Sequence, residues 1–422
     1  MKKAKIMWTI ILAINVALFF FLSSETNGKR LSHGSKNLVL NNYKSLDNVN
    51  ISGGTFNTPA QKQSVRTISV PVKGGKVYVV RKDTPTIMRV ASGAREIPVP
   101  GTRANVFVEH KTPSDQPLEI PTLEADRYLY IQLFTVHDEK QFQSLNANLK
   151  TLAVNELDES DYLTDLNEYQ EINHRGYDYV APENTLAAFR LSKKMFYNWI
   201  ETDIRSTSDG VIVLLHDAAI NRTARGSGGK KISEPVYIKN ITYANALKYD
   251  FGIWKSPAYA GEKIPTLAQA LSLCKDIGLK MTIEIKSDTI KLPDLIELVK
   301  QYGMTTKVEY MSNNKNIITN MSRLVHNGHI GYNGPCDDAL QGFLTALRIN
   351  GNTVYYHTDT YAPGTAKRAI LDKVAADNFV IVSRAYSKQA VINAPPYSRI
   401  FITNRFHPKK ILHDAAVKNR AE

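Results

Sequence analysis

The pattern of apolar and polar positions divides this 422-residue chain into an apolar start, a region of short strands and a longer region of alternating strands and helices. Residues 6–22 are apolar except for Thr9 and Asn15, and they follow the basic start MKKAK. A basic start before an apolar run is typical of a signal peptide or a signal anchor. We therefore expect residues 1–24 to be a membrane anchor or cleaved signal. Since lysines stay on the cytoplasmic side, the chain after Ser24 should lie outside the cytoplasm, held at the cell membrane or secreted.

Residues 25–60 are rich in Asn, Ser, Gly and Lys and predict a spacer. In residues 61–155, apolar and polar positions alternate over short runs that prolines interrupt. Two such runs, 68–72 and 77–80, flank Gly74 and Gly75, which predicts a hairpin. Further strands are expected at 86–90, 104–108 and 127–134. These short strands predict a small all-β sandwich, serving either as a structural spacer or as a module that binds a cell-wall polymer.

Residues 158–170 are acidic and predict a boundary helix or linker. After them, the pattern of apolar and polar residues predicts strands that alternate with helices. The expected strands are 171–174, 199–204, 211–216, 280–286, 307–312, 329–332, 353–357, 379–384 and 399–403. The expected helices are 185–196, 267–277, 293–302, 314–326, 342–349 and 366–376. This alternation predicts an α/β fold, a (β/α)8 TIM barrel over residues 171–410. One strand is surplus, and we expect it to be 353–357.

Composition narrows the classes of function. Apolar residues make up 43% of the chain and charged residues 22%, which excludes wholesale disorder and a polytopic membrane protein. Cys274 and Cys336 lie outside any CxxC or Cys/His cluster, so we expect unpaired thiols and no structural zinc site. The net charge of +13 favours polyanionic partners. Without a basic run or zinc finger, no nucleic acid is expected as partner.

Carboxylates stand two residues apart on one of these strands. Because side chains alternate along a strand, Glu201 and Asp203 should face the same way, and Glu284 stands in a similar pattern on the expected strand 280–286. Three carboxylates at one barrel mouth would repel each other and lose hydration. A divalent cation resolves both problems, and oxygen ligands suit Ca²⁺ or Mg²⁺. These residues therefore predict a metal site.

Two histidines and two fixed cations accompany the carboxylates. His174 and His216 each end an expected strand, Arg175 follows His174, and Lys286 ends the expected strand 280–286. Cations next to a metal suit a phosphoryl oxygen. One imidazole can take a proton from an attacking hydroxyl while the other gives one to the leaving oxygen. This set predicts cleavage of a phosphodiester.

The motifs around these residues resemble those of the glycerophosphodiester phosphodiesterase family, in order and at similar spacing. The matching blocks are His174-Arg175-Gly176, Pro182-Glu183-Asn184-Thr185 with Ala188-Phe189, Ile200-Glu201-Thr202-Asp203, Ser208-Asp209-Gly210, His216-Asp217, Asn221-Arg222-Thr223, Ile264-Pro265-Thr266-Leu267 and Ile283-Glu284-Ile285-Lys286. The resemblance covers about Glu171 to Pro408.

The resemblance implies a TIM-barrel phosphodiesterase that releases an alcohol and glycerol phosphate. It implies that His174 and His216 are the acid/base pair and that Arg175 and Lys286 bind the phosphate. It implies three metal ligands, which are Glu201, Asp203 and Glu284. It also implies an insertion, about 217–262, that caps the site and helps to select glycerol. The substrate's glycerol hydroxyl would attack first, and water would open the resulting cyclic phosphate. Within the insertion, Ser227-Gly228-Gly229 predicts a flexible loop.

The second half departs from the family pattern. The usual Trp-Thr pair is replaced by Val382-Ser383-Arg384, and the last strand ends in Thr403-Asn404-Arg405. The missing Trp removes a flat apolar wall near glycerol, while Arg384 and Arg405 would add positive charge at the rim. This departure leaves the substrate open, with glycerol-phosphate polymers such as teichoic acid and lysophospholipids as alternatives. Tyr332, Tyr356 and His357 would either line this side or belong to the core.

Two other functions remain open. A metal-independent phospholipase C of the phosphatidylinositol type also uses two histidines, but a cation should then replace the three carboxylates. A surface binding protein with a degenerate barrel is the other alternative. The complete set of acids, histidines and cations argues against it.

Overall fold

The computed structural model describes residues 169–404 without a break, residues 407–409 and 411–412, and shorter stretches between 43 and 157. The expected anchor over 1–24, most of the spacer, the 158–168 linker and Arg405 lie outside the described residues. Among the residues that the structure does describe, no helix is long and apolar enough to cross a bilayer.

The N-terminal strands form two antiparallel sheets. One has the order β1-β4-β9-β6-β7 and the other β10-β5-β8, with a separate β2–β3 pair. The bounds are β1 Lys44–Ser45, β2 Asn50–Ser52, β3 Thr55–Asn57, β4 Val65–Pro71, β5 Val77–Arg81, β6 Ile87–Gly93, β7 Val106–Glu109, β8 Leu118–Pro121, β9 Tyr128–Phe134 and β10 Ala153–Leu157. The strands expected in residues 61–155 are present, and β8 and β10 are additional there. Strands β1, β2 and β3 lie within the residues expected to form a spacer, and β1 pairs with β4. Face-to-face packing of the sheets as a sandwich stays a prediction.

The predicted hairpin around Gly74 and Gly75 is wrong. Strand β4 pairs with β1 and β9, whereas β5 pairs with β8 and β10. The turn instead carries the chain from one sheet to the other. Its ends are held by Thr122, whose hydroxyl donates to the carbonyl of Lys76 at 2.8 Å and accepts from the Lys76 amide at 2.9 Å. A distant residue therefore decides where the second strand pairs.

The C-terminal region is a closed barrel of eight parallel strands in the order β11-β12-β14-β15-β16-β17-β18-β19, and β19 pairs back to β11. The bounds are β11 Gln170–Asn173, β12 Trp199–Ser206, β14 Lys280–Ile285, β15 Val308–Ser312, β16 His329–Tyr332, β17 Thr353–Asp359, β18 Val380–Arg384 and β19 Ile400–Thr403. This confirms the predicted barrel and, within one to two residues at most ends, its strands.

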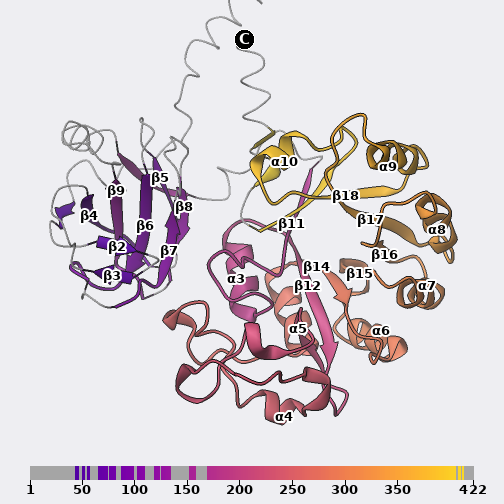
Figure 1. Cartoon of the computed structure of the whole chain (residues 1–422), viewed down its shortest axis with the longest axis horizontal. Helices are drawn as coiled ribbons and strands as arrows, with labels where there is room; N and C mark the ends of the chain where they lie inside the picture. The colour runs from indigo at the N-terminus through magenta and orange to yellow at the C-terminus, as the bar shows by residue number, and fades with distance from the viewer. Residues whose placement is uncertain are drawn as a thin grey trace, which may run out of the picture. The chain divides into compact units, whose positions relative to one another are not determined.

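Helices follow the strands and lie outside them (Figure 1). Their bounds are α3 Leu186–Lys194, α5 Leu267–Ile277, α6 Leu292–Gln301, α7 Lys315–Leu324, α8 Leu340–Leu347, α9 Ala366–Ala376 and α10 Lys388–Ile392. Helix α5 begins at a reciprocal cap, in which the Thr266 hydroxyl accepts from the amide of Gln269 and the Gln269 side chain accepts from the amide of Thr266. It ends at Gly278 with φ of 73°.

The strand outside the barrel is not 353–357, as expected, but the segment around 211–216. Its short strand β13, Ile212–Leu214, runs antiparallel to β12. Strand β17 lies between β16 and β18 in the closed barrel. The reason lies in what each strand buries. Val213 and Leu215 pack into a small core that belongs to the following insertion, so their apolar character does not require a place in the barrel wall.

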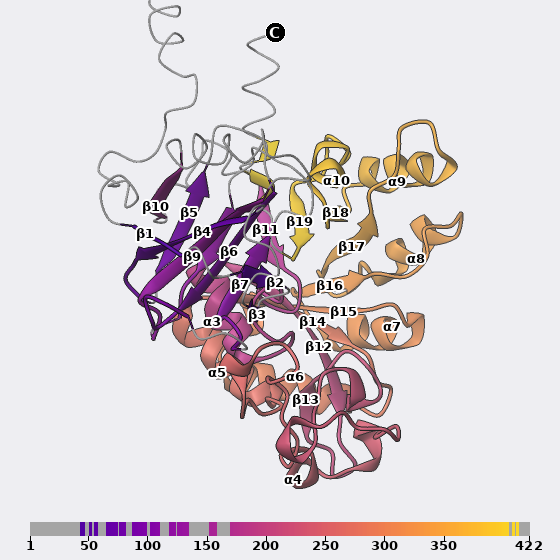
Figure 2. The same cartoon turned by 60° about the vertical axis from the view of Figure 1, so that its left-hand side comes forward.

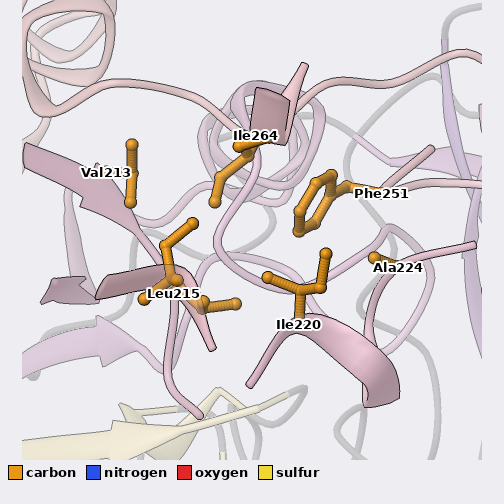
Figure 3. Packing of buried hydrophobic residues seen from close by; sticks show 8 residues of the cluster. Val213, Leu215, Ile220, Ala224, Phe251 and Ile264 are labelled. Carbon is orange, nitrogen blue, oxygen red and sulfur yellow. The ribbon is translucent and has the colours of Figure 1, made fainter. Parts of the chain in front are cut away.

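The insertion 217–262 has its own apolar core (Figure 3). Val213, Leu215, Ile220, Ala224, Phe251 and Ile264 pack together there. The turns and short helices of the insertion are η2 Ile220–Arg222, η3 Ser227–Gly229, η4 Ile238–Asn240, α4 Tyr243–Ala246 and η5 Pro257–Tyr259. Strand β13 pairs with Ile204–Ser206 at the carboxyl end of β12, and Figure 2 shows α4 in the same part of the molecule. A short segment with a core of its own can hold side chains firmly at the barrel mouth.

We expect Gly176→Ala to destabilise the barrel more than Gly210→Ala. Both glycines have positive φ, 76° and 80°, so alanine costs about 1–2 kcal/mol at either position. At Gly176 an added Cβ would also lie 2.8 Å from side-chain atoms of Ala188 and Phe189, whereas at Gly210 nothing lies within 4 Å. Overpacking adds about 1–3 kcal/mol. Urea unfolding midpoints of the two variants measure the difference, and equal midpoints would contradict the packing argument.

Candidate active site

Three carboxylates meet at the carboxyl ends of β12 and β14. Asp203 and Glu284 are partners in the β12–β14 register, and Glu201 precedes Asp203 by two residues on the same face. The ligand oxygens of all three lie within 4.8 Å of one another, and all three residues are buried. Parallel pairing therefore brings together the acids that alternation along the strands predicts.

Two cations partly offset this buried negative charge. Lys286 Nζ lies 2.6 Å from Glu284 Oε1 and 3.3 Å from Asp203 Oδ1, and Arg175 Nε lies 3.3 Å from Asp203 Oδ2. Burial by itself would raise the pKa of Asp203, but Arg175 and Lys286 outweigh it and hold that pKa below its usual range. The pKa of Glu201 is raised well above its usual range by burial and by the charges of Asp203 and Glu284. The negative charge of Glu201 is therefore poorly compensated by the neighbouring cations.

The chemistry of this cluster fits a hard divalent cation. Glu201 Oε1 is buried and accepts no hydrogen bond from any described residue, and Asp203 Oδ1 has only the ion pair with Lys286. Buried polar atoms are almost always paired, so Glu201 Oε1 needs a partner. Carboxylate oxygens are the ligands that Ca²⁺ and Mg²⁺ prefer. Glu201, Asp203 and Glu284 are thus the residues that could hold such an ion.

The loop after β11 is shaped by unusual backbone angles. Arg175 and Asn184 have φ of 56° and 54°, a region that non-glycine residues seldom adopt. The amide of Arg175 donates to Glu201 Oε2 at 3.0 Å, and Asn184 Nδ2 donates to Asp203 Oδ2 at 2.8 Å. Asn184 Oδ1 accepts from the Asp203 amide at 3.1 Å and from the Thr202 hydroxyl at 2.8 Å. The strained residues therefore orient the carboxylates.

His174 lies between the acidic triad and the cavity. Its Nε2 is 3.9 Å from Glu201 Oε2, and its Nδ1 is buried without a hydrogen bond among the described residues. The ring of Tyr386 lies 5.3 Å from its ring, centroid to centroid. Burial, and next the charge of Arg175, lower the pKa of His174 to about 3. This imidazole is therefore neutral.

His216 reaches the same cavity from the loop after β13. Its Nδ1 lies 2.6 Å from Asp217 Oδ1, which leaves Nε2 to face a substrate. Arg222 Nε donates to Asp217 Oδ2 at 2.6 Å, and its Nη1 donates to Glu183 Oε2 at 2.6 Å. Burial opposes ionisation of Asp217, but hydrogen bonds from Arg222 and His216 lower its pKa to about 2. Asp217 is therefore a charged residue that fixes the orientation of this imidazole.

A cavity of about 700 Å³ opens above these residues. The expected site residues His174, Arg175, His216, Glu284 and Lys286 line it, and Glu201 and Asp203 lie buried within contact of Arg175. Further lining residues are Asp178, Tyr179, Lys255, Asn313, Asn333, Arg384, Tyr386 and Asn404.

The structure thus brings together all seven predicted site residues, while their catalytic roles stay predictions. Arg384 lines the cavity as expected and pairs with Asp359, Nε to Oδ1, at 3.2 Å. Tyr332, Tyr356 and His357 are buried and belong to the core. Lys255 and Asp178 were not found from sequence. Neither stands in phase with a strand, and only folding brings the insertion beside the loop after β11.

Comparison with known proteins agrees with this geometry. Residues 174–325 match the glycerophosphoryl diester phosphodiesterase family. A glycerophosphodiester phosphodiesterase of Caldanaerobacter subterraneus subsp. tengcongensis is 32% identical over 188 residues, which is 44% of this chain and 74% of that protein. The Bacillus subtilis protein YhdW is 44% identical over 116 residues, covering 27% of this chain and 44% of YhdW.

The barrel also resembles a crystal structure of a glycerophosphoryl diester phosphodiesterase homologue from Silicibacter pomeroyi. The TM-score is 0.52 at 19% identity, over 59% of this chain and 94% of that one. At this identity the likeness concerns the fold. Together with the 32% identity over most of the Caldanaerobacter enzyme, the family match leads to one conclusion: the chain belongs to the glycerophosphoryl diester phosphodiesterase family and is a phosphodiesterase enzyme.

Proposed function

We propose that this enzyme hydrolyses glycerophosphodiesters to an alcohol and glycerol phosphate in a metal-dependent reaction outside the cytoplasm. The observation that carries the proposal is the meeting of a buried acidic triad and two histidines at one cavity. When bound, a divalent cation at the triad would supply positive charge to the phosphoryl oxygens. The metal-free phospholipase alternative is less well supported, because a site without metal has no use for three adjacent buried carboxylates.

The residues of this chain divide the remaining work. Arg175 and Lys286, whose charges face the cavity, hold the phosphoryl oxygens. The 2-hydroxyl of the substrate's glycerol attacks phosphorus and passes its proton to one imidazole. The bond from phosphorus to the alcohol oxygen breaks, and that oxygen takes a proton from the other imidazole. Water then opens the cyclic phosphate with the two histidines in exchanged roles, so protons and charges balance over the cycle.

The external location rests on the basic start and apolar run of residues 1–24. Substrates are then phosphodiesters of the cell surface or medium. Two are proposed, a poly(glycerol phosphate) such as teichoic acid and a lysophospholipid, and the cavity favours the first. Among the described lining residues none is aliphatic, and four are Arg or Lys, at 175, 255, 286 and 384. A charged polymer suits such a wall better than an acyl chain does.

Metal binding should stabilise the wild-type chain and be required for turnover. At one hundred times Kd, Ca²⁺ or Mg²⁺ should add about 2.7 kcal/mol to the free energy of unfolding. Glu201→Gln removes one ligand and one uncompensated buried charge. The variant should therefore gain stability without metal and lose the metal-induced rise in Tm. Differential scanning calorimetry with and without each ion measures both effects.

The matched control is Glu297→Gln on α6, an exposed glutamate that pairs with Lys300. It should keep the response of the wild type to metal. Activity that survives exhaustive chelation would overturn metal dependence and favour the phospholipase C alternative.

Replacing either histidine with alanine should lower kcat by about 10²–10⁴, the usual contribution of a general acid or base. His326→Ala, at an exposed position after α7, serves as the control and should leave kcat unchanged. Phosphorus NMR of glycerophosphocholine turnover measures the rates and reveals any cyclic phosphate. A loss below tenfold at His174 or His216 would remove that residue from the proton transfers.

Poly(glycerol phosphate) should be cleaved with higher kcat/KM than glycerophosphocholine, and this advantage should shrink as salt rises. Attraction of further phosphates to Arg384 is screened beyond about 8 Å at physiological ionic strength. Arg384→Met should reduce the advantage, whereas Arg323→Met on the exposed face of α7 should not. Equal turnover of the small diester at every ionic strength would refute the polymer as preferred substrate.

A further inference from the structure

One part of the cavity wall is not used by the proposed chemistry. Asp178 lies in the loop after β11, Asn404 directly after β19, and Lys255 in the insertion. All three line the cavity, and Asn404 and Lys255 each contact Asp178. We call them the Asp178 cluster. Asn404 Nδ2 donates to Asp178 Oδ2 at 3.0 Å, and Lys255 Nζ donates to the Asp178 carbonyl oxygen. Three distant segments of the chain thus build one polar patch.

The Asp178 cluster contains polar atoms that lack partners. Asp178 Oδ1 and Asn404 Oδ1 are both buried and accept no hydrogen bond from any residue that the structure describes. The contact with the Asp178 carboxylate sets the orientation of the Asn404 amide, because its NH₂ group must face that carboxylate. Its oxygen is therefore the free acceptor. These two acceptor oxygens lie beside the Lys255 ammonium, which has further N–H donors. A ligand group that can both donate and accept hydrogen bonds would therefore fit here.

Hydroxyl groups have this property, and a quaternary ammonium does not. A polyol hydroxyl can donate to Asp178 Oδ1 or Asn404 Oδ1 and accept from Lys255 Nζ. A choline group offers no donor and carries a positive charge, which Lys255 and Arg384 repel. Burial raises the pKa of Asp178 to about 7 even against the charge of Lys255, so its negative charge is weakened as an attraction for cations.

The position of the Asp178 cluster indicates which arm of the diester it meets. Strand β19, which ends at the cluster, borders β11 on the side away from β12 and the metal-binding acids. In the proposed reaction the attacking glycerol stays folded against the phosphorus beside those acids. The leaving alcohol lies in line with the attack and points away from it. The leaving arm therefore reaches toward β19.

We propose that Asp178, Lys255 and Asn404 form a subsite for a hydroxylated, non-cationic leaving alcohol, so that the enzyme prefers glycerophosphodiesters of polyols to those of choline or simple alcohols. This inference rests on the proposed function. It assigns the alcohol released, which the catalytic residues alone do not decide. A buried site built for hydroxyl groups rejects an analogue without them, because its own polar groups then remain unpaired.

Three diesters test the proposal: glycerophosphoglycerol, glycerophosphopropanol and glycerophosphocholine. The propanol ester keeps the carbon skeleton of the leaving glycerol and lacks both of its hydroxyls. The three compete in one tube with the full chain and the activating metal ion, and phosphorus NMR follows each signal. The ratios of kcat/KM from such a competition do not depend on how much of a variant is folded. For the wild type we expect a preference of about 10- to 100-fold for the glycerol ester over the propanol ester.

Two variants should bring this selectivity ratio toward one. Asp178→Ala removes an acceptor, and Lys255→Met keeps the apolar stem and removes the donor. Lys255→Met should also improve the relative cleavage of the choline ester, since a repelling charge is gone. The controls are Lys263→Met, an exposed lysine directly after the insertion, and Asp276→Asn, an exposed aspartate of α5. Both controls should keep the wild-type ratio.

The outcomes separate this inference from the proposed function. Equal or faster cleavage of the propanol or choline ester by the wild type would overturn the subsite and leave the phosphodiesterase intact. An unchanged preference for the glycerol ester over the propanol ester in both variants would also overturn the subsite and leave the phosphodiesterase intact. If no diester is cleaved with Ca²⁺ or Mg²⁺, the proposed function fails. Calorimetric titration of the metal-loaded chain with glycerophosphoglycerol and glycerophosphopropanol then measures the same preference without turnover, and equal affinities would overturn the subsite.

Discussion

Burial of three carboxylates at the mouth of the barrel is the constraint on which the rest of the site depends. Glu201, Asp203 and Glu284 are each at most 6% exposed. Charges so buried are costly unless they are paired or bind a metal. Neighbouring groups offset part of the cost of burying these charges. Lys286 and Arg175 supply charge, Asn184 supplies an amide donor, and the backbone amide of Arg175 supplies another. Positive φ at Arg175 and Asn184 is tolerated because it delivers these contacts.

A second set of ion pairs ties the insertion to the barrel. Arg222 of the insertion bonds Glu183 of the loop after β11 and Asp217 beside His216. Glu183 in turn bonds Arg175 at 3.0 Å. The chain of contacts therefore links both histidines through charged side chains, while the apolar core around Ile220 and Phe251 holds the insertion itself in shape. Movement of the insertion would disturb the orientation of His216 and the position of Lys255 together.

The barrel interior beneath the site is also unusually polar. Glu309 on β15 accepts a hydrogen bond from Thr282 of β14 at 2.9 Å and lies 2.6 Å from His357 Nε2 of β17. Interiors of such barrels are usually filled with branched apolar residues. Here Ile172, Trp199, Tyr355, Val382, Ile400 and Ile402 form an apolar cluster of the barrel. From the sequence, His357 could be either a cavity residue or a core residue, because its buried partner Glu309 cannot be recognised from the chain alone.

The sequence by itself determined the barrel, most of its strands and helices, and the seven residues that meet at its mouth. It could do so because side-chain alternation along a strand and the common direction of parallel strands are local rules, and they hold for Glu201, Asp203 and Glu284 whatever surrounds them. Only the tertiary structure decided which strand stays outside the barrel, that β4 and β5 belong to different sheets, and that Lys255 and Asn404 meet Asp178. Those features depend on which distant segments bury each other's apolar faces or pair each other's polar groups. Val213 and Leu215 could serve a barrel wall or an insertion core equally well by their apolar character, and only the packing around Phe251 and Ile264 distinguishes the two.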